Sequence, residues 1–69
     1  MDVSVLGRII VERRRNLGIT QTQLANLADV NINTIMKLER GKANPTLQIL
    51  AKIADILGME LKLEVKRKQ

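Results

Sequence analysis

Two helix-start signals lie close together in the middle of the chain, and they constrain its fold more than any other feature. Thr20 and Gln23 form a capping box, in which each side chain accepts a hydrogen bond from a backbone N–H at the start of a helix. Asn31 is a second N-cap residue, which leaves room for one short helix over 21–28 and a turn of two residues. Asp29 in that turn tolerates the left-handed backbone that a sharp reversal requires. The sequence therefore predicts two short helices joined by a tight turn.

The other helices are marked by hydrophobic spacing and by glycines. Gly18, Gly41 and Gly58 each follow a stretch with helical periodicity, at the position where a left-handed residue ends a helix. These patterns predict helices over 3–17, 32–40 and 47–57. The residues expected to face the interior are Leu6, Ile10, Arg14 and Leu17, then Leu24, Ala25, Leu27 and Ala28, then Val30, Ile35 and Leu38, and finally Leu47, Leu50, Ala51, Ala54 and Leu57. Gly7 lies inside the first helix at a cost of up to about 1 kcal/mol relative to alanine, and no sequence pattern explains it.

The last segment changes from helical to strand-like periodicity. Residues 59–65 alternate between apolar and charged side chains at every position, which predicts a β-strand with one apolar face. A basic tail follows over 66–69. We therefore expect a helical domain over 1–58, followed by the strand and tail over 59–69.

The composition excludes several classes of site. The 69 residues include no cysteine and no histidine, so a disulfide, a structural zinc site, and the commonest nucleophile and general base are all missing. The chain has neither paired carboxylates with a partner base nor a phosphate-binding glycine-rich loop. It also lacks Phe, Tyr and Trp, the side chains on which single-stranded bases stack. We expect a binding protein rather than an enzyme, with no catalytic residue, no metal and no cofactor.

The net charge of +5 and the pI of about 10.3 indicate a polyanionic partner, although solubility alone accounts for such a charge equally well. Nucleic acid is the preferred partner over an anionic membrane surface. No apolar run approaches the roughly 18 residues that a membrane span needs, and no signal peptide is evident. We therefore expect a cytoplasmic protein with no membrane partner.

Four separated blocks of sequence occur in the order and spacing of one known family. They are Leu17 to Ala25, Thr34 to Lys42, Asn44 to Leu47 and Ile53 to Gly58. Over residues 6–58 the chain resembles the Cro/phage-repressor (XRE-type) helix-turn-helix family, with Asp29 where that family usually has a turn glycine. The resemblance implies a compact, all-α, four-helix λ-repressor-like domain that binds double-stranded DNA, on the nucleoid of a prokaryote or on phage DNA.

Helix-turn-helix docking implies where the chain would touch DNA, because the N-terminal part of the second helix of the motif meets base edges in the major groove. Asn33 and Lys37 suit adenine and guanine edges, whereas Ile32 and Met36 suit thymine methyl groups or, alternatively, the core or a dimer contact. The expected base contacts are Asn31, Ile32, Asn33, Met36 and Lys37. The expected phosphate contacts are Gln21, Thr22, Arg40, Lys42 and Asn44. For Gln21, the resemblance implies either a phosphate contact or a brace for a side chain of the second helix, and helix capping alone is the alternative for residues 20–23.

The resemblance also implies a structural ion pair between Arg14 and Glu39. Arg14 lies on the apolar face of its helix, where a bidentate carboxylate partner would tie that helix to the second helix of the motif. The alternative is that both residues are solvated surface charges.

The C-terminal strand departs from the usual pattern, since many members of the family have a fifth helix there. A lone strand leaves its backbone N–H and C=O groups unpaired, so pairing with a second copy in a C2 homodimer is an economical arrangement. The departure resembles the HipB-type antitoxins, and the pairing would bury Met59, Leu61, Leu63 and Val65. The alternatives are a frayed tail or a strand that adds to a different protein.

Together these features favour a dimeric, sequence-specific transcriptional repressor, which often controls its own promoter. The alternative is an antitoxin that binds its operator DNA and also neutralises a cognate toxin protein. Both functions would use the same DNA-binding half of the chain.

Overall fold

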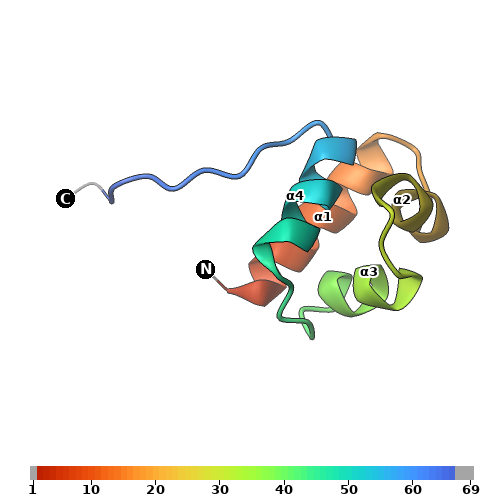
Figure 1. Ribbon diagram of the computed structural model, residues 1–69, viewed down its shortest axis with the longest axis horizontal. Coiled ribbons are helices and arrows are strands. Elements are labelled where there is room, and N and C mark those ends of the chain that lie inside the picture. The colour runs from red at the N-terminus through yellow and green to blue at the C-terminus, as the bar shows by residue number, and fades with distance from the viewer. Residues whose placement is uncertain (1, 67–69) are drawn as a thin grey trace.

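Four helices form the body of the molecule, and an extended segment leaves this body at the C-terminus (Figure 1). The structure is a computed structural model that describes residues 2–66, so residues 67–69 of the expected basic tail lie outside the described residues. The helices are α1 (Val3–Asn16), α2 (Gln21–Ala28), α3 (Ile32–Glu39) and α4 (Leu47–Ile56). The predicted all-α, four-helix domain is confirmed. α1, α3 and α4 each end one residue earlier than expected, because the next residue is the C-cap.

Each helix begins where a side chain satisfies one of its first backbone N–H groups. Thr20 Oγ1 accepts a hydrogen bond from the Gln23 N–H at 3.0 Å, and Gln23 Oε1 accepts one from the Thr20 N–H at 2.8 Å. This is the predicted capping box at the start of α2. Single side-chain caps begin the other three helices, at Asp2, Asn31 and Thr46.

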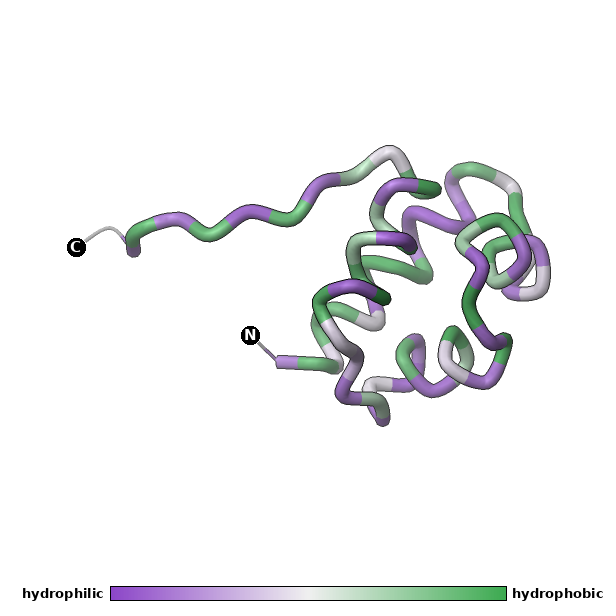
Figure 2. Tube along the Cα trace, in the orientation of Figure 1, coloured by the Kyte–Doolittle hydropathy of each residue, from purple (hydrophilic) through white to green (hydrophobic). Residues whose placement is uncertain are grey.

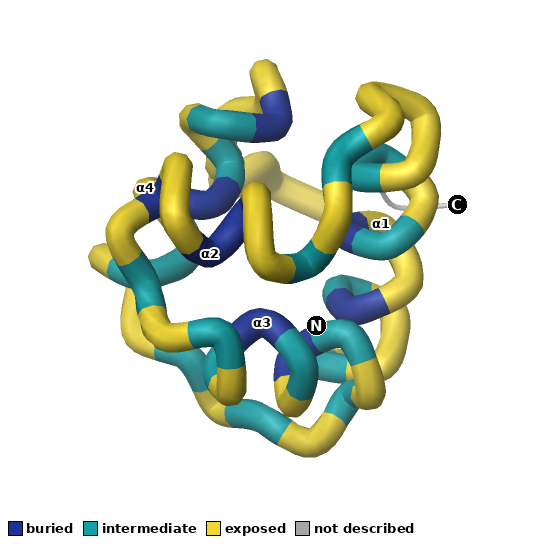
Figure 3. Tube along the Cα trace, turned by 90° about the vertical axis from the view of Figure 1, so that its right-hand side faces the viewer, coloured by how far each residue is buried: buried dark blue, intermediate teal, exposed yellow. Residues whose placement is uncertain are grey.

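The core is built from aliphatic side chains of all four helices. Figure 3 marks the buried positions along the chain in dark blue. α2 packs against both α3 and α4, and α1 packs against α3. The buried hydrophobic residues are Ile10, Leu24, Ala25, Ala28, Ile35, Leu38, Ile53 and Leu57. Because α2 and α3 both contribute to this core, burial fixes the tight turn between them.

Part of the predicted core is wrong. Leu27 is 60% exposed and Leu47 is 73% exposed, and Leu17 and Ala51 are exposed as well. Ile53, which was not among the expected core residues, is almost fully buried. α4 carries apolar residues on most of its circumference, so the helical period alone does not decide which stripe faces inward. The packing of α4 against α2 decides it instead.

Gly7 and Gly41 mark the place where α1 lies closest to the end of α3. A Cβ atom on Gly7 would overlap the carbonyl oxygen of Leu38 and would lie 3.0 Å from that of Glu39. A Cβ atom on Gly41, whose φ is +73°, would lie 2.9 Å from the Cα of Ser4. These distances explain the glycine inside α1, since a larger residue would push α1 away from α3.

The turn between α2 and α3 contains the left-handed residue that the sequence predicts. Asp29 has φ 55° and ψ 50°, and its backbone N–H donates to the carbonyl groups of Ala25 and Asn26 at the end of α2. Within the part of the chain that the structure describes, it is the one residue other than glycine with a positive φ.

The segment after α4 is extended but is not a β-strand in the single chain, so the expected strand is not found. Residues 59–66 belong to no helix or strand. A strand is formed by hydrogen bonds to a neighbouring strand, and the described residues supply none. Figure 2 shows the alternation of apolar and polar residues along this segment. Met59 and Leu61 are 40% and 45% exposed, whereas Leu63 and Val65 are 102% and 95% exposed.

We predict that Gly7→Ala lowers the free energy of unfolding by about 1–3 kcal/mol, although alanine is the better helix former. The added methyl group would overlap the Leu38 carbonyl oxygen and separate α1 from α3. Urea unfolding followed by far-ultraviolet circular dichroism measures the change. The control is Glu12→Ala at an exposed position of the same helix, which we expect to change the free energy by less than about 0.5 kcal/mol. A Gly7→Ala protein as stable as the parent would contradict the prediction.

We also predict that Asp29→Gly raises the free energy of unfolding by up to about 1 kcal/mol, because glycine adopts the left-handed conformation without steric cost. Asp29→Ala removes the same carboxylate but keeps the Cβ atom, so it serves as the matched control. We expect the alanine protein to be less stable than the glycine protein by about 1 kcal/mol or more. Equal thermal unfolding midpoints for the two variants would show that the backbone of this turn is unstrained.

Candidate DNA-binding surface

α3 presents one buried face and one exposed face. Ile35 and Leu38 are fully buried and hold the helix against the core. Asn33 and Lys37 are exposed on the opposite face, and the half-buried Met36 lies beside them. This exposed row combines an amide, an ammonium group and an apolar side chain, which are the groups that read base edges in a major groove.

The first residues of α3 have partners within the protein. Ile32 is half-buried and packs against the hydrophobic core, so it occupies the core position that the sequence left as an alternative. Asn31 is exposed, and its Oδ1 caps α3 by accepting a hydrogen bond from the Asn33 N–H at 2.8 Å. Both residues therefore help to build the start of α3.

A buried ion pair ties α1 to the C-terminal end of α3. Arg14 Nε donates to Glu39 Oε2 at 2.8 Å, and Arg14 Nη2 donates to Glu39 Oε1 at 3.0 Å. The two side chains are only 12% and 5% exposed, so the expected ion pair is present and is not a surface pair. The hydrogen bonds to Glu39 raise the pKa of Arg14 above its usual value, against the effect of burial, so the guanidinium stays charged.

Gln21 and Ile19 complete this polar network. Gln21 Nε2 donates to Glu39 Oε1 at 2.9 Å, and Arg14 Nη1 donates to the Ile19 carbonyl oxygen at 3.0 Å. Gln21 therefore braces a side chain of α3, which is one of the two roles that the resemblance implied. The network joins α1, the start of α2 and the end of α3 through one carboxylate. No sequence signal points to Ile19, because its contribution is a backbone carbonyl group.

Polar and cationic side chains surround α3. Arg40, Lys42 and Asn44 follow the helix and are exposed, and Thr22 is exposed in the first turn of α2. Within residues 2–66, neither Arg40 nor Lys42 takes part in an ion pair. Their charges are therefore available to an anionic partner.

Arg13 has a structural role that the sequence analysis missed. Its Nε donates at 2.8 Å to the carbonyl oxygen of Leu57, which is the C-cap of α4. The run of three arginines indicates only that cations lie near the end of α1. Helix packing decides that Arg14 reaches α3 while its neighbour Arg13 reaches α4.

Other kinds of site find no support in the described part of the chain. Residues 2–66 contain no group of three or more His, Cys, Asp and Glu side chains that could hold a metal ion. Over the same residues, no helix is both long enough and apolar enough to cross a membrane.

The chain matches a helix-turn-helix family model over residues 10–63. A protein described as an uncharacterized HTH-type transcriptional regulator from Methanothermobacter thermautotrophicus is 42% identical over 52 residues, which are 75% of each chain. Multiprotein-bridging factor 1 from Candida albicans is 39% identical over 62 residues, which are 90% of this chain but 40% of that protein. The crystal structure of the restriction-modification controller protein C.AhdI from Aeromonas hydrophila matches with a TM-score of 0.82 at 30% identity, covering 86% of this chain and 89% of that one.

The chain belongs to the helix-turn-helix family. Within it, the chain is a DNA-binding transcriptional regulator of the Cro/phage-repressor (XRE) type, as its four sequence blocks implied. This is a family of DNA-binding regulators, which are generally not enzymes. The same comparisons give no support to the antitoxin alternative or to a toxin partner.

We predict that Glu39→Gln lowers the free energy of unfolding by about 3 kcal/mol, because the buried guanidinium of Arg14 loses its ionic partner. Glu60→Gln is the matched control, since Glu60 pairs with Lys62 at 3.3 Å but both side chains are largely exposed. We expect the control to change the free energy by less than about 1 kcal/mol. Urea unfolding of both variants provides the measurement, and effects of equal size would show that burial does not strengthen the Arg14–Glu39 pair.

Proposed function

We propose that this protein is a sequence-specific repressor that reads double-stranded DNA as a homodimer through α3. The observation that carries this proposal is that Asn33 and Lys37 are exposed along α3. The helix itself is fixed to α1 and α2 by the hydrogen bonds that Glu39 accepts from Arg14 and Gln21. Base reading requires side chains at fixed positions relative to the groove. A rigidly supported helix also loses less conformational entropy when it binds.

Direct base contacts are assigned to the outward row of α3. Asn33 suits the N6 and N7 atoms of adenine, and Lys37 suits the O6 and N7 atoms of guanine. Met36 suits a thymine methyl group. Asn31 and Ile32 lie at the N-terminal end of α3, which enters the groove in this docking mode. Only the exposed part of the half-buried Ile32 side chain can contact a base.

Phosphate contacts are assigned to the residues on either side of this row. They are Gln21, Thr22, Arg40, Lys42 and Asn44. Because the side-chain amide of Gln21 donates to Glu39, its phosphate contact is assigned to its backbone N–H at the start of α2. The positive end of the helix dipole favours an anion at that position.

In the proposed homodimer, residues 1–58 bind DNA and residues 59–69 join the two copies. Two-fold symmetry presents two α3 helices to successive major grooves, about 34 Å apart. Pairing of the C-terminal segments would cover Met59, Leu61, Leu63 and Val65 and would satisfy backbone groups that the single chain leaves unpaired. The dimer represses by occupying promoter DNA, and we place it in the cytoplasm, on the nucleoid of a prokaryote or on phage DNA.

We predict that Lys37→Ala and Lys42→Ala have different effects, although each removes one positive charge. Lys37→Ala relaxes base preference at one position, with a loss of discrimination of about 1–3 kcal/mol. Lys42→Ala weakens binding to all sequences alike and reduces the slope of log affinity against log salt concentration by about 1. Selection of binding sites from random duplexes, followed by fluorescence anisotropy over a salt series, measures both effects.

Two results would overturn the proposed function. One is an affinity for duplex DNA that does not change with salt, since phosphate contacts release counterions. The other is a Lys37→Ala protein that loses affinity equally for selected and unselected duplexes, because α3 would then contact only the DNA backbone.

A further inference from the structure

The C-terminal segment carries charges of alternating sign along one of its faces. The charged residues at alternate positions are Glu60, Lys62, Glu64 and Lys66. The apolar residues between them are Met59, Leu61, Leu63 and Val65. Successive side chains of an extended segment point to opposite faces, so one face is apolar and the other carries the charges. The 3.3 Å ion pair between Lys62 Nζ and Glu60 Oε1 joins two neighbours on the charged face.

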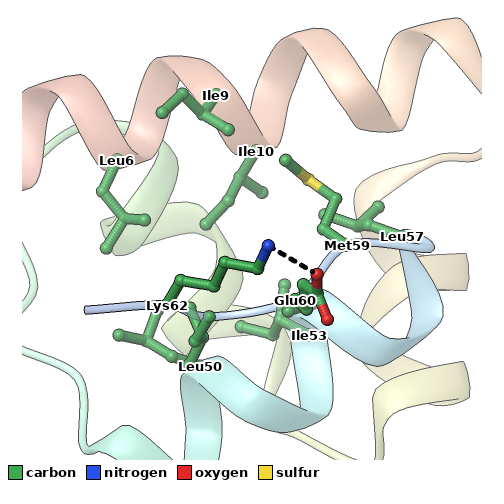
Figure 4. A pocket seen from close by; sticks show the side chains of 11 residues that line it. Leu6, Ile9, Ile10, Leu50, Ile53, Leu57, Met59, Glu60 and Lys62 are labelled. Atoms are coloured by element: carbon green, nitrogen blue, oxygen red, sulfur yellow. Dashed lines mark ion pairs between the residues drawn. The ribbon is translucent and has the colours of Figure 1, made fainter. Parts of the chain in front are cut away.

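The C-terminal segment begins over a groove in the helical body (Figure 4). This groove has a volume of about 300 Å³ and lies between α1, α4 and the start of the C-terminal segment. Its walls include Leu6 and Ile9 from α1 and Leu50 and Ile53 from α4. The segment lines it with Met59 and Leu61 and also with Glu60 and Lys62, whose ion pair lies at the groove. Leu63 and Val65 lie beyond the body and are fully exposed. Nothing in the described chain covers this second half of the apolar face.

We propose, on the basis of the proposed homodimer, that the segments of two copies pair as antiparallel strands with Leu63 facing Leu63 across the two-fold axis. In this alignment Glu60 faces Lys66, and Lys62 faces Glu64, and each pair occurs twice by symmetry. Every charge of the described segment then lies opposite a charge of the other sign. On the apolar face, Leu61 of each copy lies opposite Val65 of the other.

Other alignments oppose like charges or lose pairs. Parallel strands related by a two-fold axis are in register, so each charge would face its own counterpart. Antiparallel strands centred on Lys62 or on Glu64 place that charged residue against itself. Centring on Leu61 or on Val65 keeps half of the opposite-charge pairs. A shift of one residue between the strands sets apolar side chains opposite charged ones.

The same alignment provides an occupant for the groove between α1 and α4. Side chains that face each other across antiparallel strands lie about 5 Å apart. Leu61 lines the groove, so Val65 of the second copy lies beside it at the groove opening. The second copy thereby covers apolar surface that the single chain leaves exposed.

Cysteine cross-linking of the full chain tests the alignment, because the chain has no cysteine of its own. Four single variants are compared, namely Leu61→Cys, Lys62→Cys, Leu63→Cys and Glu64→Cys. We expect Leu63→Cys to form the intermolecular disulfide fastest under mild oxidation, because directly opposed Cα atoms lie about 4.5–5.5 Å apart. In the proposed alignment the other three positions lie beyond the roughly 7 Å that a disulfide spans. Fastest cross-linking at another position, or equal rates at all four, overturns the alignment.

Charge exchange provides a second test that introduces no thiol. Lys62→Glu and Glu64→Lys each turn two opposite-charge pairs into like-charge pairs, so each raises the dissociation constant of the dimer by about tenfold at low salt. The double variant restores opposite charges at both positions, and its dissociation constant should return to within about threefold of the parent value. Sedimentation equilibrium measures all four proteins. If the double variant weakens the dimer by as much as the two single changes added together, the alignment is overturned.

The molar mass of the unmodified protein in solution distinguishes a failure of the proposed homodimer from a failure of the strand alignment alone. If light scattering finds a monomer at every concentration, the homodimer of the proposed function fails and the alignment fails with it. If the chain is a dimer but Leu63→Cys cross-links slowly, only the alignment fails.

Discussion

The placement of α3 depends on the carboxylate of Glu39, which is almost completely removed from water. Its two oxygens accept hydrogen bonds from Arg14 on α1 and from Gln21 on α2. A buried carboxylate without such partners costs several kcal/mol, and hydrogen bonds depend on distance and direction in a way that apolar contacts do not. All three helices must therefore be correctly placed at the same time for this one charge to be satisfied. The core supplies most of the cohesion, and the network selects the orientation of the helix within it.

A steric constraint acts at the same end of α3. Gly7 lets the backbone of α1 approach the carbonyl groups of Leu38 and Glu39, which a side chain at that position would prevent. The hydrogen-bonded network and this close approach reinforce each other, since Arg14 reaches Glu39 only when α1 and α3 are this close. Both constraints lie on the inner side of α3. Asn33 and Lys37 lie on the outer side and take no part in either constraint, so in the proposed mode of DNA reading their substitution would leave this scaffold unchanged.

The local features of this fold can be predicted from the sequence because their causes lie within a few residues of one another. The capping box at Thr20 and the left-handed turn at Asp29 are of this kind. Burial that depends on how separate helices pack together cannot be predicted in this way. This is the case for Leu27, Leu47 and Ile32. A glycine is required at position 7 because the carbonyl group of Leu38, some thirty residues away in the sequence, leaves no room for a Cβ atom. The Arg14–Glu39 pair is a distant contact too, and it was predictable only because the chain resembles a family in which those positions are joined.

Electrostatics acts in two different ways within this small chain. One largely buried ion pair orients α3 within the chain, and the loss of either partner there would be costly because the other charge would stay desolvated. The charges of the C-terminal segment are exposed and individually weak, so they can select an alignment only by repetition. In the proposed dimer, their alignment would also bear on DNA binding, since moving one strand by two residues displaces the two copies by about 7 Å relative to each other. That displacement equals about two base-pair steps, enough to take two α3 helices out of phase with successive major grooves. In the proposed dimer, the alternating charges would thus also set the spacing of the two α3 helices on DNA.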